Sequence, residues 1–512
     1  MVSLTARRLG RTALAGLALA VAGASRLPAQ SSPYLPLDDV AYAYLDALQA
    51  RGELRGLSGI ERPYTVQAVR EALAAVRETP ERARWLRALA AALEKHYPAA
   101  LPLDTGVFTA TVAPYAVAQT SAVRELMRAD DESAVHPGFA GRLLLHTGRV
   151  TAVARGSGDR RLRDDPEFRG KRDRAVAGRL EDAYLGAQWR YAEVAAGRTS
   201  RRWAPPGVQG LMVGDYTYSY DHLFTRFGGE RLRLTSISAR LDDRRLGPDS
   251  LAQRYVSTHR LAARVGAVEF GATESVLYGG VDRGFDPTLA SPTMVWSVAQ
   301  YAENRDVNVL YGADFVWRPR FLGSIAAQFM LDDVQIDDCG PGCNEPPSYG
   351  VTVAVEGVPL AGDVRGFGSY TQISNLAYRT GNAWEQYASL DVGLGLGYSD
   401  YDEVRAGFDL GTLLPVPVRA YAALRRQGAG DYRSPFPPAD LLPLSPAFLL
   451  DPVTKTFRLG ASGAARLFDA LELRGDVGLN QVRTTAPTRT EFEGRITVAV
   501  ESARLRFSTS LR

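Results

Sequence analysis

From residue 105 to the C-terminus, apolar and polar side chains alternate with a period of two, the pattern of a β-strand with two different faces. The pattern recurs in runs of about ten residues, separated by turn residues such as Gly323 and Gly362. The clearest runs are 307–317, 390–398, 471–480 and 503–511. Many such strands can bury their apolar faces only by stacking two sheets, by forming a propeller or by closing one sheet into a barrel.

The polar faces of these runs favour a membrane barrel. They carry strings of glycines and opposite charges, which line the lumen of a large barrel and are seldom needed on the outer face of a soluble sandwich. Aromatic residues near strand ends, such as Tyr216, Tyr218, Trp296 and Trp317, match the girdles found at membrane interfaces. We therefore predict a mainly β fold, a transmembrane antiparallel β-barrel over residues 105–512. We expect about 18 strands, because bacterial barrels have an even number.

The N-terminus indicates the compartment. Arg7, Arg8 and Arg11 precede an apolar run at 13–24, and a small-residue zone ends near Gln30, as in a secretory signal peptide. The apolar run is too short to cross a bilayer as a helix, which needs about 20 residues. We predict a signal peptide over residues 1–30 and a protein of the bacterial outer membrane. The charge balance, 60 basic against 57 acidic residues, excludes a nucleic-acid partner.

Between the signal and the barrel the period is helical. One helix begins after Asp38 or Asp39 and ends at Gly52. A second starts at Thr65, and a third has Thr79 as its N-cap. We predict a small helical module over residues 31–104, located in the periplasm, that buries its core only by packing on something else.

Two clusters could hold special chemistry in one loop. In an exported chain, Cys339 and Cys343 predict a small structural disulfide, and the spacing does not fit a redox pair at a helix start. Nearby aspartates could bind Ca²⁺, but we favour a solvated acidic loop tip because the spacing does not match an EF-hand. These aspartates are Asp332, Asp333, Asp337 and Asp338. We predict no metal and no cofactor.

Catalytic motifs are also missing from the sequence. The 5 histidines show no H-x₃-H spacing, which argues against a zinc site. A hydrolase on the lipid-facing wall would need a serine beside a histidine, and His146 and His222 lie in strand-like segments. We predict no catalytic residue. Two long polar stretches, 120–137 and 156–175, flank one apparent hairpin strand at 139–154, so one of them should pack in the lumen or lie in the periplasm.

The segment 197–207 is the densest in special residues after the helices. Its guanidiniums can pair with carboxylates and stack on sugar faces, as an acidic polysaccharide offers, or they can line the lumen. The candidate glycan-binding or lumen-lining residues are Arg198, Arg201, Arg202 and Trp203.

Several motifs, taken in order, resemble the Wzi family of capsule-assembly outer-membrane proteins. The matching segments are 36–42, 48–52, 62–65, 196–198, 202–203, 206–207, 308–314 and 317–319. The turn at 203–207 departs from the family pattern, because it reads Trp-Ala-Pro-Pro-Gly. The resemblance implies an 18-stranded barrel with a periplasmic helical bundle. It also implies a lectin-like protein that anchors capsular or extracellular polysaccharide.

Three functions follow as hypotheses. The first is a non-enzymatic surface protein, a monomer in contact with outer-membrane lipid and with capsular or extracellular polysaccharide. The alternative is a porin or solute channel, which requires a continuous water-filled lumen. A hydrolase embedded in the barrel is the third, and nothing in the sequence demands it.

Overall fold

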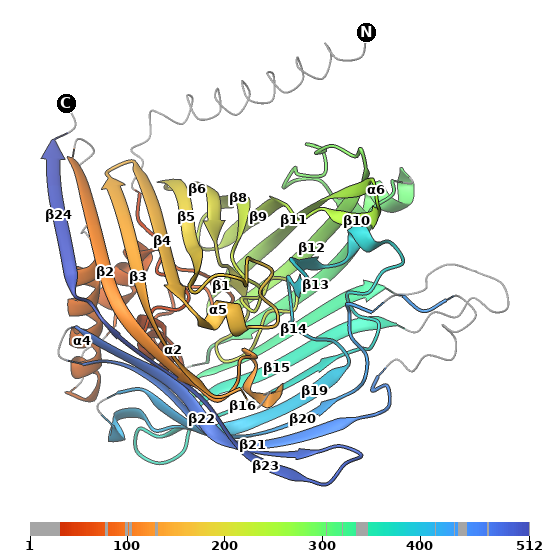
Figure 1. Cartoon of the computed structure of the whole chain (residues 1–512). Coiled ribbons are helices and arrows are strands. Elements are labelled where there is room, and N and C mark those ends of the chain that lie inside the picture. Colours follow the sequence, from red (N-terminus) through yellow and green to blue (C-terminus); the bar gives the residue numbers. More distant parts are fainter. Residues whose placement is uncertain are drawn as a thin grey trace.

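The chain has 512 residues, and a computed structural model describes most of them (Figure 1). The described residues are 31–76, 80–97, 101, 105–128, 132–303, 305–319, 321–333, 347–414, 416–434, 436–438, 448–467 and 470–510. The predicted signal peptide, Thr79, Cys339 and Cys343 lie outside them, as do Asp337 and Asp338. Within the described part of the chain, no helix combines the length and apolarity that a membrane crossing requires.

The barrel has eighteen antiparallel strands and is closed, as the alternation predicted. Its strands are β2 (Thr105–Gln119), β3 (Ala134–Thr147), β4 (Val150–Asp159), β5 (Ala177–Trp189), β6 (Ala192–Thr199), β8 (Tyr220–Gly228), β9 (Leu232–Arg240), β11 (Ser250–Val265), β12 (Val268–Val281), β13 (Asn308–Trp317), β14 (Ser324–Asp333), β15 (Ser348–Pro359), β16 (Arg365–Ile373), β19 (Tyr401–Asp409), β20 (Val418–Gln427), β21 (Thr454–Leu467), β22 (Leu471–Arg483), β23 (Arg489–Val500) and β24 (Ala503–Ser510).

Closure occurs between the first strand and the last. β23 and β24 are consecutive halves of one strand, and both pair with β2: Ala499 faces Tyr115, and Phe507 faces Phe108. β2 also pairs with β3 along its whole length, so no barrel edge is left open there. The short strand β10 (Arg244–Gly247) extends β11 beyond the wall.

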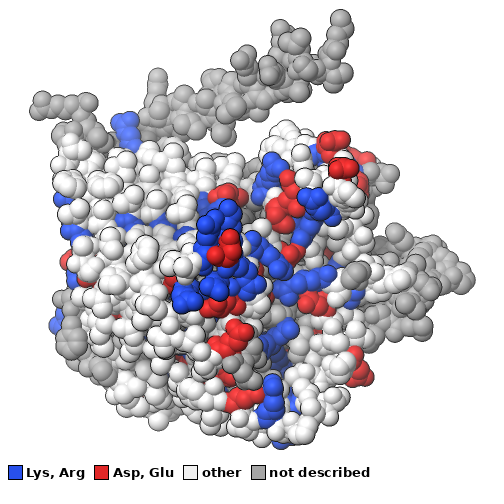
Figure 2. Space-filling view, viewed as in Figure 1, with Lys and Arg blue, Asp and Glu red and all other residues white. Residues whose placement is uncertain are grey.

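The alternation sets the two faces of the wall. In the last strand, Leu505 and Phe507 are each 61% exposed on the outside, while Arg504 points inward to the helices. The runs 307–317, 471–480 and 503–511 are therefore confirmed as barrel strands in the expected phase over residues 308–317, 471–480 and 503–510. Figure 2 shows that the outer surface over β2 to β6 carries almost no charge, whereas charged residues gather around the short helix α5 (Arg161–Asp164).

The run 390–398 is a correction, because it is not a strand of the wall. It lies inside the lumen and forms only the two-residue strand β18 (Val392–Gly393), paired with β17 (Ala388–Ser389). Leu394, Leu396 and Tyr398 are buried in a core there. Its glycines let backbones meet, because a Cβ on Gly395 would lie 2.1 Å from the carbonyl oxygen of Leu211. The alternating glycines of this segment therefore allow close packing of backbone on both of its faces, and they do not form a polar face toward an open lumen.

The hairpin segment 139–154 forms two strands, β3 and β4, which are joined by the tight turn after Thr147. Both long polar stretches therefore leave the wall at the same end, and neither needs to lie at the opposite end. The wall has short turns at one end, such as those after Thr147, Trp189 and Val265, and its long loops at the other.

The N-terminal module packs against the short-turn end of the lumen. Its helices are α2 (Ala41–Gln49), α3 (Val66–Ala74) and α4 (Pro80–His96), and they share a core that includes Leu45, Val69 and Leu89. Thr65 caps α3, since its side chain accepts a hydrogen bond from the N–H of Ala68. Arg318, just after β13, donates to the carbonyl of Leu57 at 2.9 Å, which ties the module to the wall.

Much of the remaining lumen is filled by loop segments rather than by polar side chains alone. Residues from 211–216, 373–401 and 432 form an apolar core against the inner wall. The prediction that Tyr216 and Tyr218 belong to a membrane girdle is wrong, because both are buried in cores of the protein. Trp296 is also not exposed to lipid, since it begins the helix α6 (Trp296–Ala302), packs on Val276 and stacks on His259.

The remaining short helical turns lie in loops. They are η2 (Leu126–Arg128), η3 (Ala383–Glu385) and η4 (Gly411–Leu413). η2 belongs to the loop between β2 and β3, which lies at the long-loop end and enters the lumen mouth. This placement positions Arg128 at the candidate site.

Candidate functional site at the barrel mouth

The four residues singled out in the sequence do not form one site. The short strand β7 (Arg202–Trp203) pairs inside the barrel with β1 (Glu61–Arg62) of the N-terminal module. Trp203 is 3% exposed, and its carbonyl accepts a hydrogen bond from Gln328 at 2.7 Å. Arg202 lies 3.4 Å from Asp215. These two residues line the lumen and connect the module to the wall.

Arg201 and Arg198 lie on opposite faces of the wall region. Arg201 is buried, donates from Nε to His222 at 2.8 Å and covers the ring of Phe224. Arg198 lies on the outward face of β6, where its guanidinium makes a bidentate pair with Asp221. Only Arg198 is accessible without rearrangement, and it is already paired.

His146 and His222 are not beside an outward-facing serine. His146 lies against Ser31 and Thr151 under the N-terminal module, with Nδ1 3.0 Å from the Thr151 hydroxyl. His222 receives the Arg201 bond inside the barrel. Asp332 is buried and so does not belong to a solvated loop tip as predicted, and its carboxylate accepts the N–H of Tyr378 at 2.6 Å. Among the described residues, no cluster of metal-ligating side chains is present.

A polar cavity of about 450 Å³, here called the mouth pocket, lies at the long-loop end. Its walls come from η2, from the loops after β16 and β20, and from the ends of β20 to β23. The residues that line it include Arg128, Tyr398, Ser399, Arg425, Gln427, Asp431, Thr454, Thr456, Asn480, Arg489 and Glu491. The cavity therefore combines strand residues, which are held by the wall, with loop residues that fold inward.

An aromatic and cationic platform forms one side of the mouth pocket. The guanidinium of Arg128 lies 3.8 Å from the centre of the Tyr398 ring. The Tyr398 hydroxyl is 2.6 Å from that of Tyr216, which holds the ring in place from below. Because Tyr398 is buried and the guanidinium covers its ring, the flat group that this platform offers for stacking is the guanidinium of Arg128.

Several polar atoms at the mouth pocket have no partner among the described residues. Gln427 uses its amide N–H to donate to the carbonyl of Ser399 at 2.8 Å, and its Oε1 atom is left without a donor. The buried Ser399 hydroxyl and the Nη1 atom of Arg425 are also without partners in the described chain. Buried polar groups are normally hydrogen-bonded, so this set of donors and acceptors indicates a polar ligand or ordered water.

The charge at the base of the mouth pocket is balanced. Arg425 donates to Glu403 at 2.6 Å and to Glu125 at 3.2 Å. Burial raises the pKa of Glu125, but the neighbouring Arg425 and Arg405 outweigh it, so its pKa lies below the usual value. Glu125 is thus a carboxylate at neutral pH. The pocket is polar without a strong net charge at this point.

Sequence reasoning missed the mouth pocket because it placed Tyr398 in the barrel wall. The available signal was the Gly428–Asp431 stretch after β20, a turn-rich segment where a strand ends. Nothing in that signal indicates that the loop after β16 folds back to meet it. The site therefore depends on contacts between segments far apart in the chain.

The fold was compared with solved structures. Wzi, an outer-membrane protein of Escherichia coli involved in group 1 capsule assembly, matches with a TM-score of 0.61, at 12% identity, over 92% of this chain and 100% of that chain. The fold is Wzi-like. Two porin-type barrels match less well, OccAB3 of Acinetobacter baumannii (TM-score 0.44, 10% identity, 79% of this chain and 100% of that one) and OprD of Pseudomonas aeruginosa (0.42, 10%, 79% and 95%).

No protein-family model matches the sequence, and no curated protein matches it either. The Wzi-like fold is therefore established by structure at an identity too low to carry residue roles across. It is the fold of an outer-membrane barrel.

Proposed function

We propose that this protein binds polysaccharide at the outer mouth of its barrel and retains it at the cell surface without catalysis. The mouth pocket carries the proposal, because a cavity of about 450 Å³ presents a guanidinium stacked on a buried aromatic ring, together with donors and acceptors that have no partner among the described residues. Sugars offer hydroxyls that both donate and accept, together with flat ring faces. Wzi, which shares the fold, is described as a carbohydrate-binding β-barrel, and this supports the same function.

The orientation in the membrane follows from the loops. Bacterial barrels place short turns in the periplasm and long loops outside. The mouth pocket is built from long loops, so it faces the exterior. The N-terminal module packs at the short-turn end and, in this orientation, lies in the periplasm.

The filled lumen favours binding over passage. A solute channel requires a continuous aqueous path. Here the strand pair β1–β7, the module and the apolar core around Leu211, Tyr387 and Leu396 occupy the interior. The protein accordingly acts at its surface rather than as a general pore.

The test is retention of polysaccharide by cells. The gene is deleted in its host, and polysaccharide is quantified in the cell pellet and in the medium. We expect the total to be unchanged and the polysaccharide to move into the medium. Complementation with Arg128→Gln/Thr454→Val, which removes a stacked cation and a hydroxyl from the mouth pocket, should restore retention poorly. Purified protein with these changes should bind the host polysaccharide about tenfold more weakly.

Arg198→Gln is the matched control, since it removes an arginine from the outward face of the wall and should restore retention fully. An unaltered pellet-to-medium ratio in the deletion strain would contradict the anchoring function. Full retention by the mouth variant would contradict the assignment of the pocket while leaving the anchoring function in place.

A further inference from the structure

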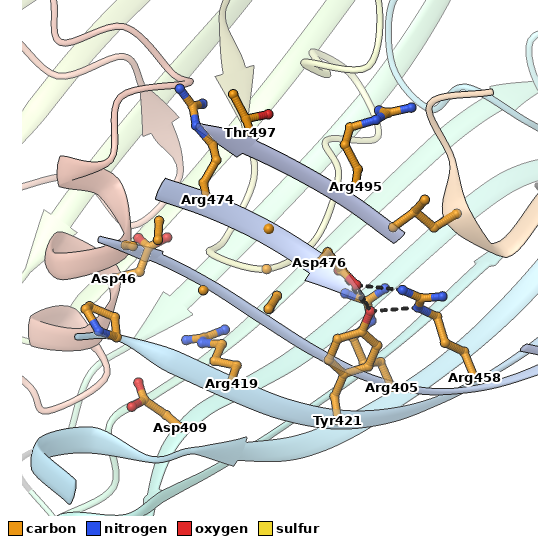
Figure 3. A pocket seen from close by; sticks show the side chains of 18 of the residues that line it. Asp46, Arg405, Asp409, Arg419, Tyr421, Arg458, Arg474, Asp476, Arg495 and Thr497 are labelled. Carbon is orange, nitrogen blue, oxygen red and sulfur yellow. Dashed lines mark hydrogen bonds and ion pairs between the residues drawn. The ribbon is translucent and has the colours of Figure 1, made fainter. Parts of the chain in front are cut away.

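A second cavity, here called the inner pocket, lies deeper in the lumen between α2 and the wall from β19 to β23. Its volume is about 520 Å³. Figure 3 shows Arg474, Thr497 and Arg495 on β22 and β23, with Arg419 and Arg405 on neighbouring strands. The charged residues that line it are Arg124, Arg405, Arg419, Arg458, Arg474, Arg495, Asp46, Glu125, Asp409 and Asp476.

Every acid that lines the inner pocket is already bound to an arginine. Asp46 pairs with Arg62, and Asp409 lies 3.5 Å from Arg51. Glu125 is held by Arg425 at 3.2 Å. Asp476 binds Arg458 at 2.7 Å and also accepts the hydroxyl of Tyr421. Three of these four partner arginines come from outside the pocket lining, and only the Asp476–Arg458 pair joins an acid and an arginine that both line it.

Three of the arginines that line the inner pocket form ion pairs with glutamates that do not line it. Arg419 binds Glu356 at 2.7 Å, and Arg124 binds Glu167 at 2.9 Å. The Nε atom of Arg405 lies 3.4 Å from the Glu403 carboxylate. These pairs balance the charges of Arg419, Arg124 and Arg405 and hold their guanidiniums in place.

Two arginines of the inner pocket are not neutralised. Among the described residues, no carboxylate lies within 4.0 Å of Arg474 or Arg495. Arg495 donates only to the backbone carbonyls of Ser121 and Val123, and its buried Nε–H has no acceptor in the described chain. Arg474 is attracted at longer range by Asp38, which is itself paired with Arg155 at 2.8 Å.

We propose that the inner pocket is a binding site for an anionic sugar, whose carboxylates accept hydrogen bonds from Arg474 and Arg495. A guanidinium in a low-dielectric interior requires a counter-charge, and a planar carboxylate matches its fork of donors. The Thr497 hydroxyl, directly opposite Arg474 across the β22–β23 pair, and the Ser462 hydroxyl supply polar contacts for the ligand. The volume is suited to a small saccharide rather than a polymer.

This site is distinct from the mouth pocket and does not depend on the function proposed for it. The mouth pocket presents a mixed set of donors and acceptors near paired charges, whereas the inner pocket presents unmatched donors. A neutral glycan therefore has no reason to prefer the inner pocket. Inorganic phosphate also offers anionic oxygen acceptors to the arginines. A comparison of phosphate with a sugar acid therefore shows whether the pocket selects any small anion or specifically a sugar acid.

The experiment is calorimetric titration of the purified full-length protein in detergent with digalacturonate, with lactose as a neutral disaccharide and with inorganic phosphate. We expect digalacturonate to bind and lactose to bind at least about tenfold more weakly, since each charge-assisted contact is worth about a factor of ten or more. The variants Arg474→Gln and Arg495→Gln should each lose about tenfold in digalacturonate affinity. Both should fold, because each removes a charge that has no paired carboxylate.

Arg474→Lys tests charge against geometry and should retain part of the affinity that Arg474→Gln loses. Arg240→Gln, an exposed arginine paired with Asp243, is the control and should bind like the parent. Binding of phosphate without digalacturonate would overturn the sugar-acid assignment. The proposal also fails if no anion binds, or if Arg474→Gln/Arg495→Gln binds as the parent does. The mouth variant Arg128→Gln/Thr454→Val should leave this affinity unchanged, so the two sites are tested separately.

Discussion

Arginine carries much of the polar packing inside this barrel, and Arg260 on β11 is the clearest case. Its side chain is 0% exposed and reaches three carboxylates from three elements. The guanidinium lies 2.6 Å from Asp314, 2.6 Å from Glu61 and 3.4 Å from Glu269. Because Glu61 belongs to β1, this arginine connects the barrel wall to the N-terminal module.

Replacing Arg260 should cost substantial stability. In Arg260→Met the carboxylates of Asp314 and Glu61 lose their central partner in a buried site, and removing one member of such a cluster costs about 3–5 kcal/mol. Because Arg233 and Arg264 also contact Glu269, this carboxylate keeps partners in the variant. The loss of unfolding free energy should therefore lie at the lower end of that range. The measurement is the urea midpoint of the folded barrel in detergent micelles.

Arg240→Met serves as the comparison for Arg260→Met. Arg240 is exposed on the outer face and pairs with Asp243, so its loss should change the unfolding free energy by less than about 1 kcal/mol. Equal effects of the two substitutions would show that the buried cluster does not stabilise the barrel.

At the scale of elements, the N-terminal module is joined to the barrel by pairs that cross between helices, β1 and the wall. Arg62 of β1 pairs with Asp46 of α2 and covers the rings of Tyr42 and Tyr64. Burial alone raises the pKa of Asp46, but the Arg62 guanidinium and its hydrogen bond outweigh it, so the pKa lies below the usual value. Asp46 therefore links α2 to the β1–β7 pair through its charge.

The lowered pKa of Asp46 predicts how the module responds to acid. A carboxyl whose pKa is lower in the folded state stabilises the fold above its unfolded pKa of about 4, and that contribution is lost as the pH falls. At pH 7, Asp46→Asn should lower the unfolding free energy by about 1–3 kcal/mol, because it leaves Arg62 buried without its counter-charge. The difference between parent and variant should shrink below pH 4.

Unfolding curves at pH 7 and pH 3 measure this effect. Gln67→Ala, on the exposed side of α3 and paired with Glu71, is the control for changes in the module. A difference between parent and Asp46→Asn that stays constant from pH 7 to pH 3 would contradict an ionic role for Asp46.

For the whole molecule, the decisive feature is that a barrel of eighteen strands is filled from both ends. The module enters from the short-turn end, where a Cβ on Gly357 would lie 1.6 Å from the Ala50 carbonyl oxygen. Loops from the other end fold inward, and Tyr387 donates to the carbonyl of Met212 at 2.6 Å within them. An empty barrel of this size would hold an aqueous channel.

Because the lumen is filled, we expect the protein not to conduct ions. The full chain, reconstituted in a planar bilayer, should show no steady porin-like conductance, because the interior is packed with apolar side chains and ion pairs. A porin of known conductance in the same bilayer is the control. Steady ohmic conductance steps from this protein would contradict a lumen that is closed to ions and would favour the channel hypothesis.

Local patterns predicted the barrel well where one face meets lipid and the other does not. Leu473 and Leu479 on β22 are exposed on the outer face, while Arg474 and Asp476 line the inner pocket, in the phase expected from the sequence. The same rule failed for 390–398, because a segment buried on both sides also alternates when glycines allow close contact. A period of two reports extended backbone, not the surroundings of its faces.

The amino-acid sequence by itself determined the extended strands and the helices of the module, since periodicity is a local property that each segment carries alone. Only the tertiary structure decided which loops enter the lumen, which arginines find carboxylates and where unpartnered polar atoms meet a cavity. Arg201, Arg474 and Arg495 look alike in the sequence, yet Arg201 is packed beneath the module while Arg474 and Arg495 face the inner pocket. The physical reason is that charge pairing depends on distances between residues far apart in the chain, and closure of the barrel sets those distances.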